Sequence, residues 1–206
     1  MRREIQATFY LFYRYNFIFI IDTNNMKRKN YKVAGLSMLL GILLMTNSCT
    51  SSSTNAPVYT GVKTNGSLSV STITSTTGGA YAPRNVVAIW IEDNSGKFIK
   101  TLLVKAQTRM GYLTNWLSAT PSANKVDAIS GATTSSFGNI TCSWNGTDSY
   151  GTLVSDGTYR VCMELTDKDA TGNFSNFTFS KGTTTDTQTP VNKPSFSNVS
   201  IVWTPQ

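Results

Sequence analysis

The sequence contains no histidine among its 206 residues. This absence excludes the Ser-His-Asp and Cys-His arrangements of nucleophilic catalysis and removes the commonest zinc ligand. Charged residues make up only 14% of the chain, and Glu92 and Asp93 have no partner carboxylates at the spacing of a hydrolase dyad. Asp167 and Asp169, beside Asn173, are more typical of a solvated turn than of a calcium site. We therefore expect no catalytic residue, no metal site and no stand-alone enzyme.

Cysteine is also scarce, with three residues in all. Cys142 and Cys162 lie in stretches of alternating apolar residues, in a chain that we expect to enter an oxidising compartment. Cys142 shares a face with Ile140 and Trp144, whereas Cys162 lies opposite the apolar row that begins at Tyr159. Because a disulfide joins neighbouring strands from one face only, we expect these two thiols to stay unbonded.

The apolar run 33–45 is too short to span a bilayer comfortably. It follows Met26 and the positively charged segment 27–32, an order that is typical of an export signal. Residues 46–49 (TNSC) then resemble a bacterial lipobox. This resemblance implies cleavage before Cys49 and lipidation of its sulfur. The alternative is an ordinary signal peptide with an incidental cysteine.

These segments predict the organisation of the chain. We expect a lipoprotein signal peptide over residues 26–48, so that 1–25 is a mis-assigned upstream start; the alternative for 1–25 is a second membrane segment, which Arg14 interrupts. Residues 49–66 contain few large apolar groups and predict a flexible tether. The folded domain is expected over residues 67–206.

The net charge of +7 comes mostly from the leader. From Cys49 onward there are 11 basic and 9 acidic side chains, which leaves a net charge of +2. No basic stripe remains to follow the phosphates of a nucleic acid, so we expect no nucleic-acid partner. Acyl chains on Cys49, at about 0.8 kcal/mol per buried CH₂ group, would instead anchor the protein to a membrane. We expect it in the cell envelope of a Gram-negative bacterium, periplasmic or at the outer membrane.

Short stretches of β character alternate with turn residues over the folded part. Segment 85–92 is apolar on both faces, as in a central strand, and the clearest alternation runs from Tyr159 to Leu165. A short helix is expected over 109–117. Together the segments predict an all-β fold, an antiparallel β-sandwich of about seven strands and one short helix. The expected strands are 67–74, 85–92, 98–104, 139–144, 159–165, a segment at Phe177 and Phe179, and a last one from Val199 to Trp203.

The heptapeptide 127–133 (DAISGAT) lies in a long connection, 118–138, and long loops in compact domains tend to be functional or disordered. The heptapeptide resembles the acceptor motif of bacterial flavin transferases, D-x-x-[S/T]-G-A-[T/S]. This resemblance implies that the last hydroxyl carries FMN through a phosphoester. The residues at the fixed positions are Asp127, Ser130, Gly131, Ala132 and Thr133.

Four of the five fixed positions have a chemical reason. Gly131 and Ala132 leave the backbone open to an enzyme. Asp127 could help to hold a metal on the donor pyrophosphate during transfer to Thr133. The alternative is a surface turn in a chain that is rich in serine and threonine.

Two wider resemblances place this motif in context. Segment 144–159 resembles the W-[DN]-G-x-D…G…D-G-x-Y hairpin of the Ig-like domain in flagellar hook-capping proteins, which indicates fold rather than role. Residues 79–203 resemble the periplasmic family called domain of unknown function twenty-two seventy-one. Its genes often neighbour membrane redox proteins and flavin transferases, which implies such partners. The landmarks are Tyr81-Ala82-Pro83, 87–93, 96–97, Thr101-Leu102, Tyr112-Leu113, Trp116, the heptapeptide and the hairpin.

The leading hypothesis is a lipid-anchored β-sandwich that carries covalent FMN on Thr133 and passes electrons outside the cytoplasm. The competing hypothesis is a structural or interaction lipoprotein, an Ig-like binding module with no cofactor. A sugar-binding module would need an exposed aromatic platform. All four tryptophans lie in apolar patterns that predict core packing.

Overall fold

The computed structural model describes residues 56–120 and 122–206. The predicted signal peptide, the lipobox with Cys49, and the first part of the tether lie outside the described residues. Within the described part, no helix has both the length and the apolar character needed to cross a membrane.

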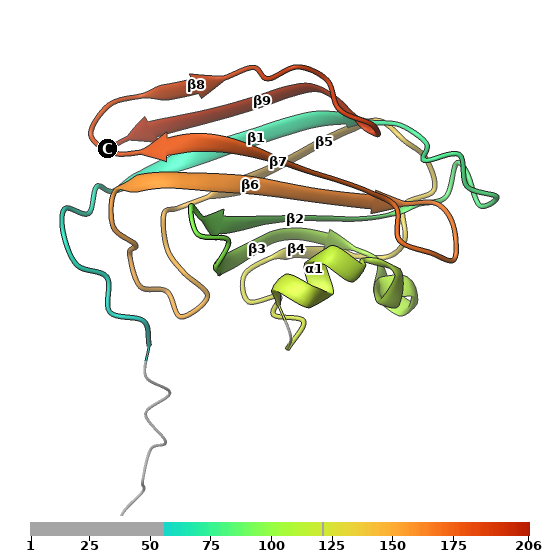
Figure 1. The fold of residues 1–206 in the computed structure, drawn as a ribbon, viewed down its shortest axis with the longest axis horizontal. Helices are drawn as coiled ribbons and strands as arrows, with labels where there is room; N and C mark the ends of the chain where they lie inside the picture. Colours follow the sequence, from blue (N-terminus) through green and yellow to red (C-terminus); the bar gives the residue numbers. More distant parts are fainter. Residues whose placement is uncertain (1–55, 121) are drawn as a thin grey trace, which may run out of the picture. The chain divides into compact units, whose positions relative to one another are not determined.

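In the described part of the chain, nine strands form two sheets that pack face to face (Figure 1). The four-stranded sheet has the order β5-β1-β9-β8, and the five-stranded sheet has the order β4-β3-β2-β6-β7. All pairs are antiparallel except β3 with β4. The first sheet contains β1 (Gly66–Thr74), β5 (Asn139–Trp144), β8 (Asp186–Gln188) and β9 (Phe196–Pro205). The second contains β2 (Val86–Asp93), β3 (Phe98–Lys105), β4 (Ile129–Gly131), β6 (Gly157–Thr166) and β7 (Asn173–Lys181).

This arrangement confirms the predicted all-β sandwich. The two strands beyond the expected seven, β4 and β8, have only three residues each. Strands of that length leave no periodicity to detect in a sequence. β4 falls inside the connection 118–138, which the sequence predicts to be a long loop.

The central strand β2 is buried on both faces because each face meets a different layer. Val87, Ile89 and Ile91 belong to the core between the sheets. Val86 and Trp90, which alternate with them, belong to a second cluster beneath the short helices. The sequence-based expectation of a central strand is therefore correct, and β2 pairs with β3 and β6 on its two sides.

The predicted helix over 109–117 is divided in two. A 3-10 helix spans Gln107–Tyr112, and α1 spans Thr114–Ala119. The break falls at Leu113, which is buried and has non-helical angles (φ −85°, ψ 68°). The buried carboxylate of Glu164 on β6 accepts hydrogen bonds from the backbone N–H groups of Asn115 and Trp116 and so fixes the start of α1.

The four tryptophans are core residues, with exposed fractions of 2% or less. Trp144 packs against Tyr159, Phe179 and Trp203, with ring centroids 5.5–6.2 Å apart. Its Nε1 donates to the Thr147 carbonyl oxygen at 2.6 Å. None of these rings offers the exposed platform that a sugar-binding module would need.

Cys142 and Cys162 are both free and buried, and they lie in different layers. Cys142 belongs to the core between the sheets, whereas Cys162 belongs to the cluster under the short helices. This agrees with the absence of a bond expected from the alternation of the two strands.

The segment before β1 is attached to the domain through a buried lysine. Thr64 donates to Asp156 from its backbone N–H (2.8 Å) and its hydroxyl (2.6 Å). Lys181 Nζ lies 2.7 Å from Asp156 Oδ1 and donates to the Thr64 carbonyl oxygen at 2.9 Å. The last residues of the predicted tether are thus fixed to the loop that precedes β6.

Candidate functional site

The acceptor-like segment forms the edge of the five-stranded sheet. β4 pairs in parallel with β3, Ile129 opposite Leu103 and Gly131 opposite Lys105. All three residues of β4 are exposed. Since β4 is the last strand of its sheet, its outer edge is free for another protein to approach.

The two ends of the motif lie at opposite ends of β4. At one end Asp127, whose side chain is 72% exposed, lies 3.2 Å from the buried Lys100 ammonium. At the other end Thr133 follows the strand. Asp127 meets Lys100, whereas Gly131 pairs with Lys105, about 17 Å further along β3, so the structure does not bring the Asp127 carboxylate beside the Thr133 hydroxyl. Ser130, Gly131 and Ala132 lie between them, exposed.

Thr133 and Thr134 have different surroundings. Thr134 and Asn85 exchange two backbone hydrogen bonds, and the Thr134 hydroxyl donates to the Asn85 carbonyl oxygen at 2.9 Å. Within the described part of the chain, no hydrogen bond engages the Thr133 hydroxyl. The preceding Gly131 carbonyl is held by the Ala106 N–H at 3.2 Å. The backbone on both sides of Thr133 is therefore fixed while its hydroxyl stays available.

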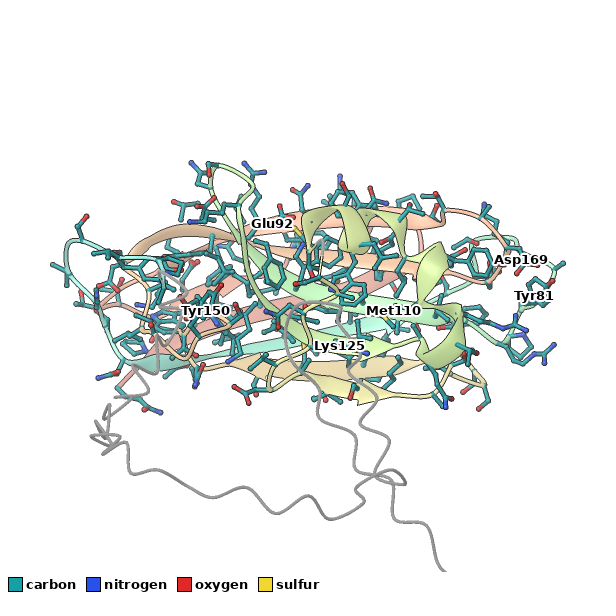
Figure 2. All side chains as sticks on the ribbon, turned by 90° about the horizontal axis from the view of Figure 1, so that it is seen from below. Tyr81, Glu92, Met110, Lys125, Tyr150 and Asp169 are labelled. Atoms are coloured by element: carbon teal, nitrogen blue, oxygen red, sulfur yellow. The ribbon has the colours of Figure 1, made fainter. Side chains whose placement is uncertain are left out.

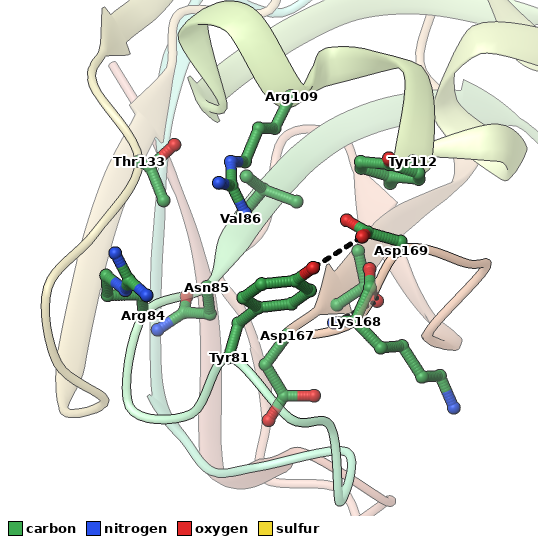
Figure 3. Close-up of a pocket in the computed structure, with 11 residues that line it drawn as sticks. Tyr81, Arg84, Asn85, Val86, Arg109, Tyr112, Thr133, Asp167, Lys168 and Asp169 are labelled. Atoms are coloured by element: carbon green, nitrogen blue, oxygen red, sulfur yellow. Dashed lines mark hydrogen bonds between the residues drawn. The ribbon is translucent and has the colours of Figure 1, made fainter.

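Thr133 lines a pocket of about 130 Å³ (Figure 3). No other residue of the motif takes part. The remaining walls come from the turn before β2, the 3-10 helix, and the end of β6 with the loop that follows it. These residues are Tyr81, Arg84, Asn85, Val86, Arg109, Tyr112, Thr166, Asp167, Lys168 and Asp169.

Two arginines stand on the Thr133 side of this pocket (Figure 3). The Arg109 guanidinium lies 5.0 Å from the centroid of the Tyr81 ring, a cation–π distance. Among the described residues, the only ion pairs join Lys100 to Asp127 and Lys181 to Asp156. Arg84 and Arg109 are exposed, and without a carboxylate partner both present free positive charge.

Two tyrosines and Asp169 form the other side. The Tyr81 hydroxyl donates to Asp169 Oδ2 at 2.5 Å. Hydrogen bonding with Asp169 raises the pKa of Tyr81, and Asp169 raises the pKa of Tyr112 in the same way. Both phenols are therefore neutral near pH 7, and the Asp169 carboxylate is bonded to Tyr81 and forms no ion pair among the described residues.

Asp167 fixes the turn that carries Tyr81 and Arg84. Its buried carboxylate accepts hydrogen bonds from the Thr76 and Thr77 hydroxyls and from the Thr77 and Gly79 N–H groups. Burial acts to raise the pKa of Asp167, but these hydrogen bonds outweigh it and hold the pKa below its ordinary value. A Cβ on Gly79 would lie 2.2 Å from the Asp167 carbonyl oxygen, so only glycine fits there.

The pocket suits a phosphate that is joined to an aromatic ring. Arginine guanidinium groups bind phosphate oxygens bidentately, and the tyrosines add aromatic surface. The volume is below the roughly 300–1,000 Å³ of pockets that enclose a drug-sized ligand. A ligand larger than a phosphate group would therefore be only partly enclosed. Within the described residues no group of three or more potential ligands is placed to hold a metal.

A second pocket of about 220 Å³ contains no residue of the motif. It lies toward the other end of the domain, as the positions of Tyr150 and Tyr81 in Figure 2 show. Its one carboxylate, Asp148, accepts hydrogen bonds at Oδ1 from the backbone N–H groups of Tyr150 and Thr152. The other oxygen, Oδ2, has no partner in the described part of the chain and no contact with solvent, so a ligand in this pocket does not reach it.

Sequence reasoning singled out Thr133 but did not predict that Arg84, Arg109 and the two tyrosines line a pocket beside it. Tyr81 and Tyr112 were noted only as family landmarks. They lie about 30 residues apart in the chain and meet because of the fold. The one available signal was that both tyrosines belong to the same ordered set of landmarks as the heptapeptide.

Comparison with protein families gives one match. The model described as "Predicted periplasmic protein (DUF2271)" covers residues 67–195, more than half of the chain. Comparisons with curated proteins and with solved structures gave no match. The matched range runs from β1 to the residue before β9 and includes the acceptor segment and the pocket beside Thr133. The chain is thus an extracytoplasmic protein of the cell envelope and belongs to the predicted periplasmic family DUF2271.

Proposed function

We propose that the protein carries FMN, joined to the Thr133 oxygen by a phosphoester, and passes electrons outside the cytoplasm while a lipid on Cys49 anchors it to the membrane. The observation that carries the proposal is the position of Thr133. Of the five motif residues it alone lines the pocket, and it does so beside two arginines that have no ion-pair partner among residues 56–120 and 122–206. The neighbouring Thr134 hydroxyl is already bonded to Asn85.

The attachment is a group transfer from flavin adenine dinucleotide, catalysed by a flavin transferase. Thr133 Oγ1 forms a bond to the phosphorus of the FMN half, and the P–O bond of the pyrophosphate breaks. AMP leaves, and the hydroxyl proton passes to a base of the transferase. No electrons are exchanged, so the step needs no oxidant or reductant. The exposed edge of β4 gives the transferase access to the acceptor.

Bound FMN supplies one- and two-electron transfer, which the side chains of this protein do not provide. The chain contributes position and environment. Arg84 and Arg109 would hold the phosphate, and Tyr81 and Tyr112 would flank the ring. Because the pocket is small, part of the ring would remain exposed, which suits exchange of electrons with a membrane redox protein.

Intact mass measurement tests this proposal. Co-expressed with an active flavin transferase, with magnesium present, the mature protein should gain the mass of one FMN less one water and keep it after denaturation. Thr133→Ala should abolish the gain, whereas Thr134→Ala and Ser135→Ala should retain it. An unmodified wild-type protein, beside a second acceptor that the same transferase modifies, would contradict the proposal.

The second candidate is a structural or interaction lipoprotein without a cofactor. It is favoured by the hydrogen bonds between Thr134 and Asn85, since the Gly-Ala-Thr turn then has a structural purpose of its own. This candidate predicts an unmodified Thr133 and no yellow colour in the purified protein.

A further inference from the structure

We infer that the pocket beside Thr133 recognises FMN non-covalently through its phosphate, and that Arg109 selects the phosphorylated flavin over riboflavin. The identity of the ligand rests on the proposed function. The recognition itself does not depend on a covalent bond, because it uses side chains that surround Thr133 rather than the Thr133 oxygen.

Arg109 has the geometry of a phosphate-binding residue. Its guanidinium is held over the Tyr81 ring at 5.0 Å, which orders the side chain before a ligand arrives. Its backbone is placed by a 2.7 Å hydrogen bond from its N–H to the Ala106 carbonyl oxygen, at the end of β3. An ordered and unpaired guanidinium binds phosphate with less loss of side-chain entropy than a free one.

Arg84 approaches from another element. Its N–H donates to the Tyr81 carbonyl oxygen at 2.9 Å, which closes the turn before β2. The next residue, Asn85, forms the backbone bridge to Thr134. This chain of contacts connects Arg84 to the acceptor segment, so the two arginines approach Thr133 from different sides (Figure 3).

Among the described residues, neither carboxylate of the pocket forms an ion pair with these arginines. Asp167 accepts four hydrogen bonds from the segment 76–79, and Asp169 accepts one from Tyr81. Lys168 also lines the pocket but lies on the Asp169 side, away from Thr133 (Figure 3). The two arginines therefore give the Thr133 end its positive charge, and the Tyr81 phenol bonded to Asp169 lies at the other end.

This polarity determines the orientation of the ligand. The phosphate belongs at the arginine end, where the acceptor oxygen also lies, and the uncharged ring system belongs on the tyrosine side. Riboflavin offers the same ring without the phosphate. The arginines should therefore distinguish the two flavins, whereas the tyrosines should not.

The test uses the mature protein carrying Thr133→Ala, which cannot form the phosphoester. Titration with FMN and with riboflavin, followed by quenching of flavin fluorescence, should give at least about tenfold tighter binding of FMN, a difference of roughly 1.4 kcal/mol. Inorganic phosphate should compete with FMN. Added salt should weaken the binding of FMN and leave that of riboflavin nearly unchanged.

Arg109→Gln, added to this protein, should remove most of the preference for FMN, and Arg84→Gln should reduce it. Lys125→Gln is the matched control, since Lys125 is an exposed cation away from the pocket (Figure 2). Arg84, Arg109 and Lys125 are exposed, so thermal unfolding should confirm that each variant is folded. Equal affinity for the two flavins, no binding of either, or an unchanged preference in Arg109→Gln would overturn the inference.

This result is independent of the covalent chemistry. A preference for FMN in a protein whose wild type is never modified would leave the inference standing and contradict the proposed function. Covalent loading of the wild-type protein, with no preference for FMN in the Thr133→Ala protein, would support the proposed function and contradict the inference.

Discussion

The hydroxyls of Thr133 and Thr134 are adjacent in the chain but have different surroundings. Thr134 donates to the Asn85 carbonyl oxygen at 2.9 Å, whereas Thr133 lines the pocket without a hydrogen-bond partner in the described part of the chain. Stability can therefore separate them. Thr134→Ala should lower the free energy of unfolding by about 1 kcal/mol, and Thr133→Ala should change it by no more than about 0.5 kcal/mol. Urea denaturation measures both, and a larger loss in Thr133→Ala would identify Thr133 as the structural partner of the turn.

The aromatic cluster around Trp144 should dominate the stability of the sandwich. Trp144→Ala removes a buried ring that contacts three others and should cost about 3–5 kcal/mol. Tyr159→Phe removes only the hydrogen bond to the Ser155 carbonyl oxygen, 2.6 Å long, and should cost about 1 kcal/mol. Urea denaturation should show this difference, and a neutral Trp144→Ala would contradict the assignment of Trp144 to the core.

Acid should release the segment before β1. Burial acts to raise the pKa of Asp156, but hydrogen bonds from Lys181 and Thr64 outweigh it and hold the pKa below its ordinary value. A carboxyl group whose pKa is lowered by folding stabilises the protein above its unfolded pKa, near 4, and this contribution is lost as the pH falls through the folded pKa. We expect the free energy of unfolding to vary little between about pH 6 and 8, because the chain has no histidine to titrate there. The free energy of unfolding should decrease once the pH is lowered below about 4.

The control for this prediction is Asp156→Asn, which should be less stable at neutral pH and should lose part of the decline in acid. Unfolding free energies measured as a function of pH would contradict the account if the variant and the wild-type protein declined in parallel.

Asp127 should affect the transfer of the flavin and not its binding. It is exposed and lies at the end of β4 away from Thr133. Asp127→Ala should therefore slow covalent loading by the transferase, while the affinity of the Thr133→Ala protein for free FMN should not change when Asp127→Ala is added. Time courses of loading and fluorescence titrations measure the two effects. A weakened affinity for free FMN would place Asp127 in the pocket and contradict the geometry.

Membrane attachment should depend on Cys49. In a Gram-negative host, the wild-type protein should partition into detergent, and Cys49→Ser should release it to the soluble fraction. Cys142→Ala is the matched control and should stay in the detergent fraction. Its thiol is buried in the core between the sheets, where it cannot carry a lipid. A Cys49→Ser protein that stayed with the membrane would contradict lipidation at this position.

Much of the fold could be predicted because its signals are local. The alternation from Tyr159 to Leu165 and the two apolar faces of β2 follow directly from which side of a strand each residue occupies. The parallel pairing of β4 with β3 could not be predicted, since three residues carry no period. The divided helix depends on the burial of Leu113, which local propensity does not determine.

The candidate site could be predicted only in part, because only part of it is formed by residues that are contiguous in the sequence. The acceptor motif is contiguous and could be recognised in the sequence. The pocket gathers Arg84, Arg109 and Asp169 from three separate segments, and their meeting depends on the packing of the 3-10 helix and the β6–β7 loop at one end of the sheet. No spacing in the sequence encodes such a contact.

The most direct test of the central claim is to locate the flavin within the chain. Trypsin should release residues 126–160 as one peptide, because no lysine or arginine lies between Lys125 and Arg160. After co-expression with an active flavin transferase, tandem mass spectrometry of this peptide should show FMN less one water on Thr133, and on no other hydroxyl residue. An unmodified peptide, or a flavin on a different residue, would contradict the claim that Thr133 carries the cofactor.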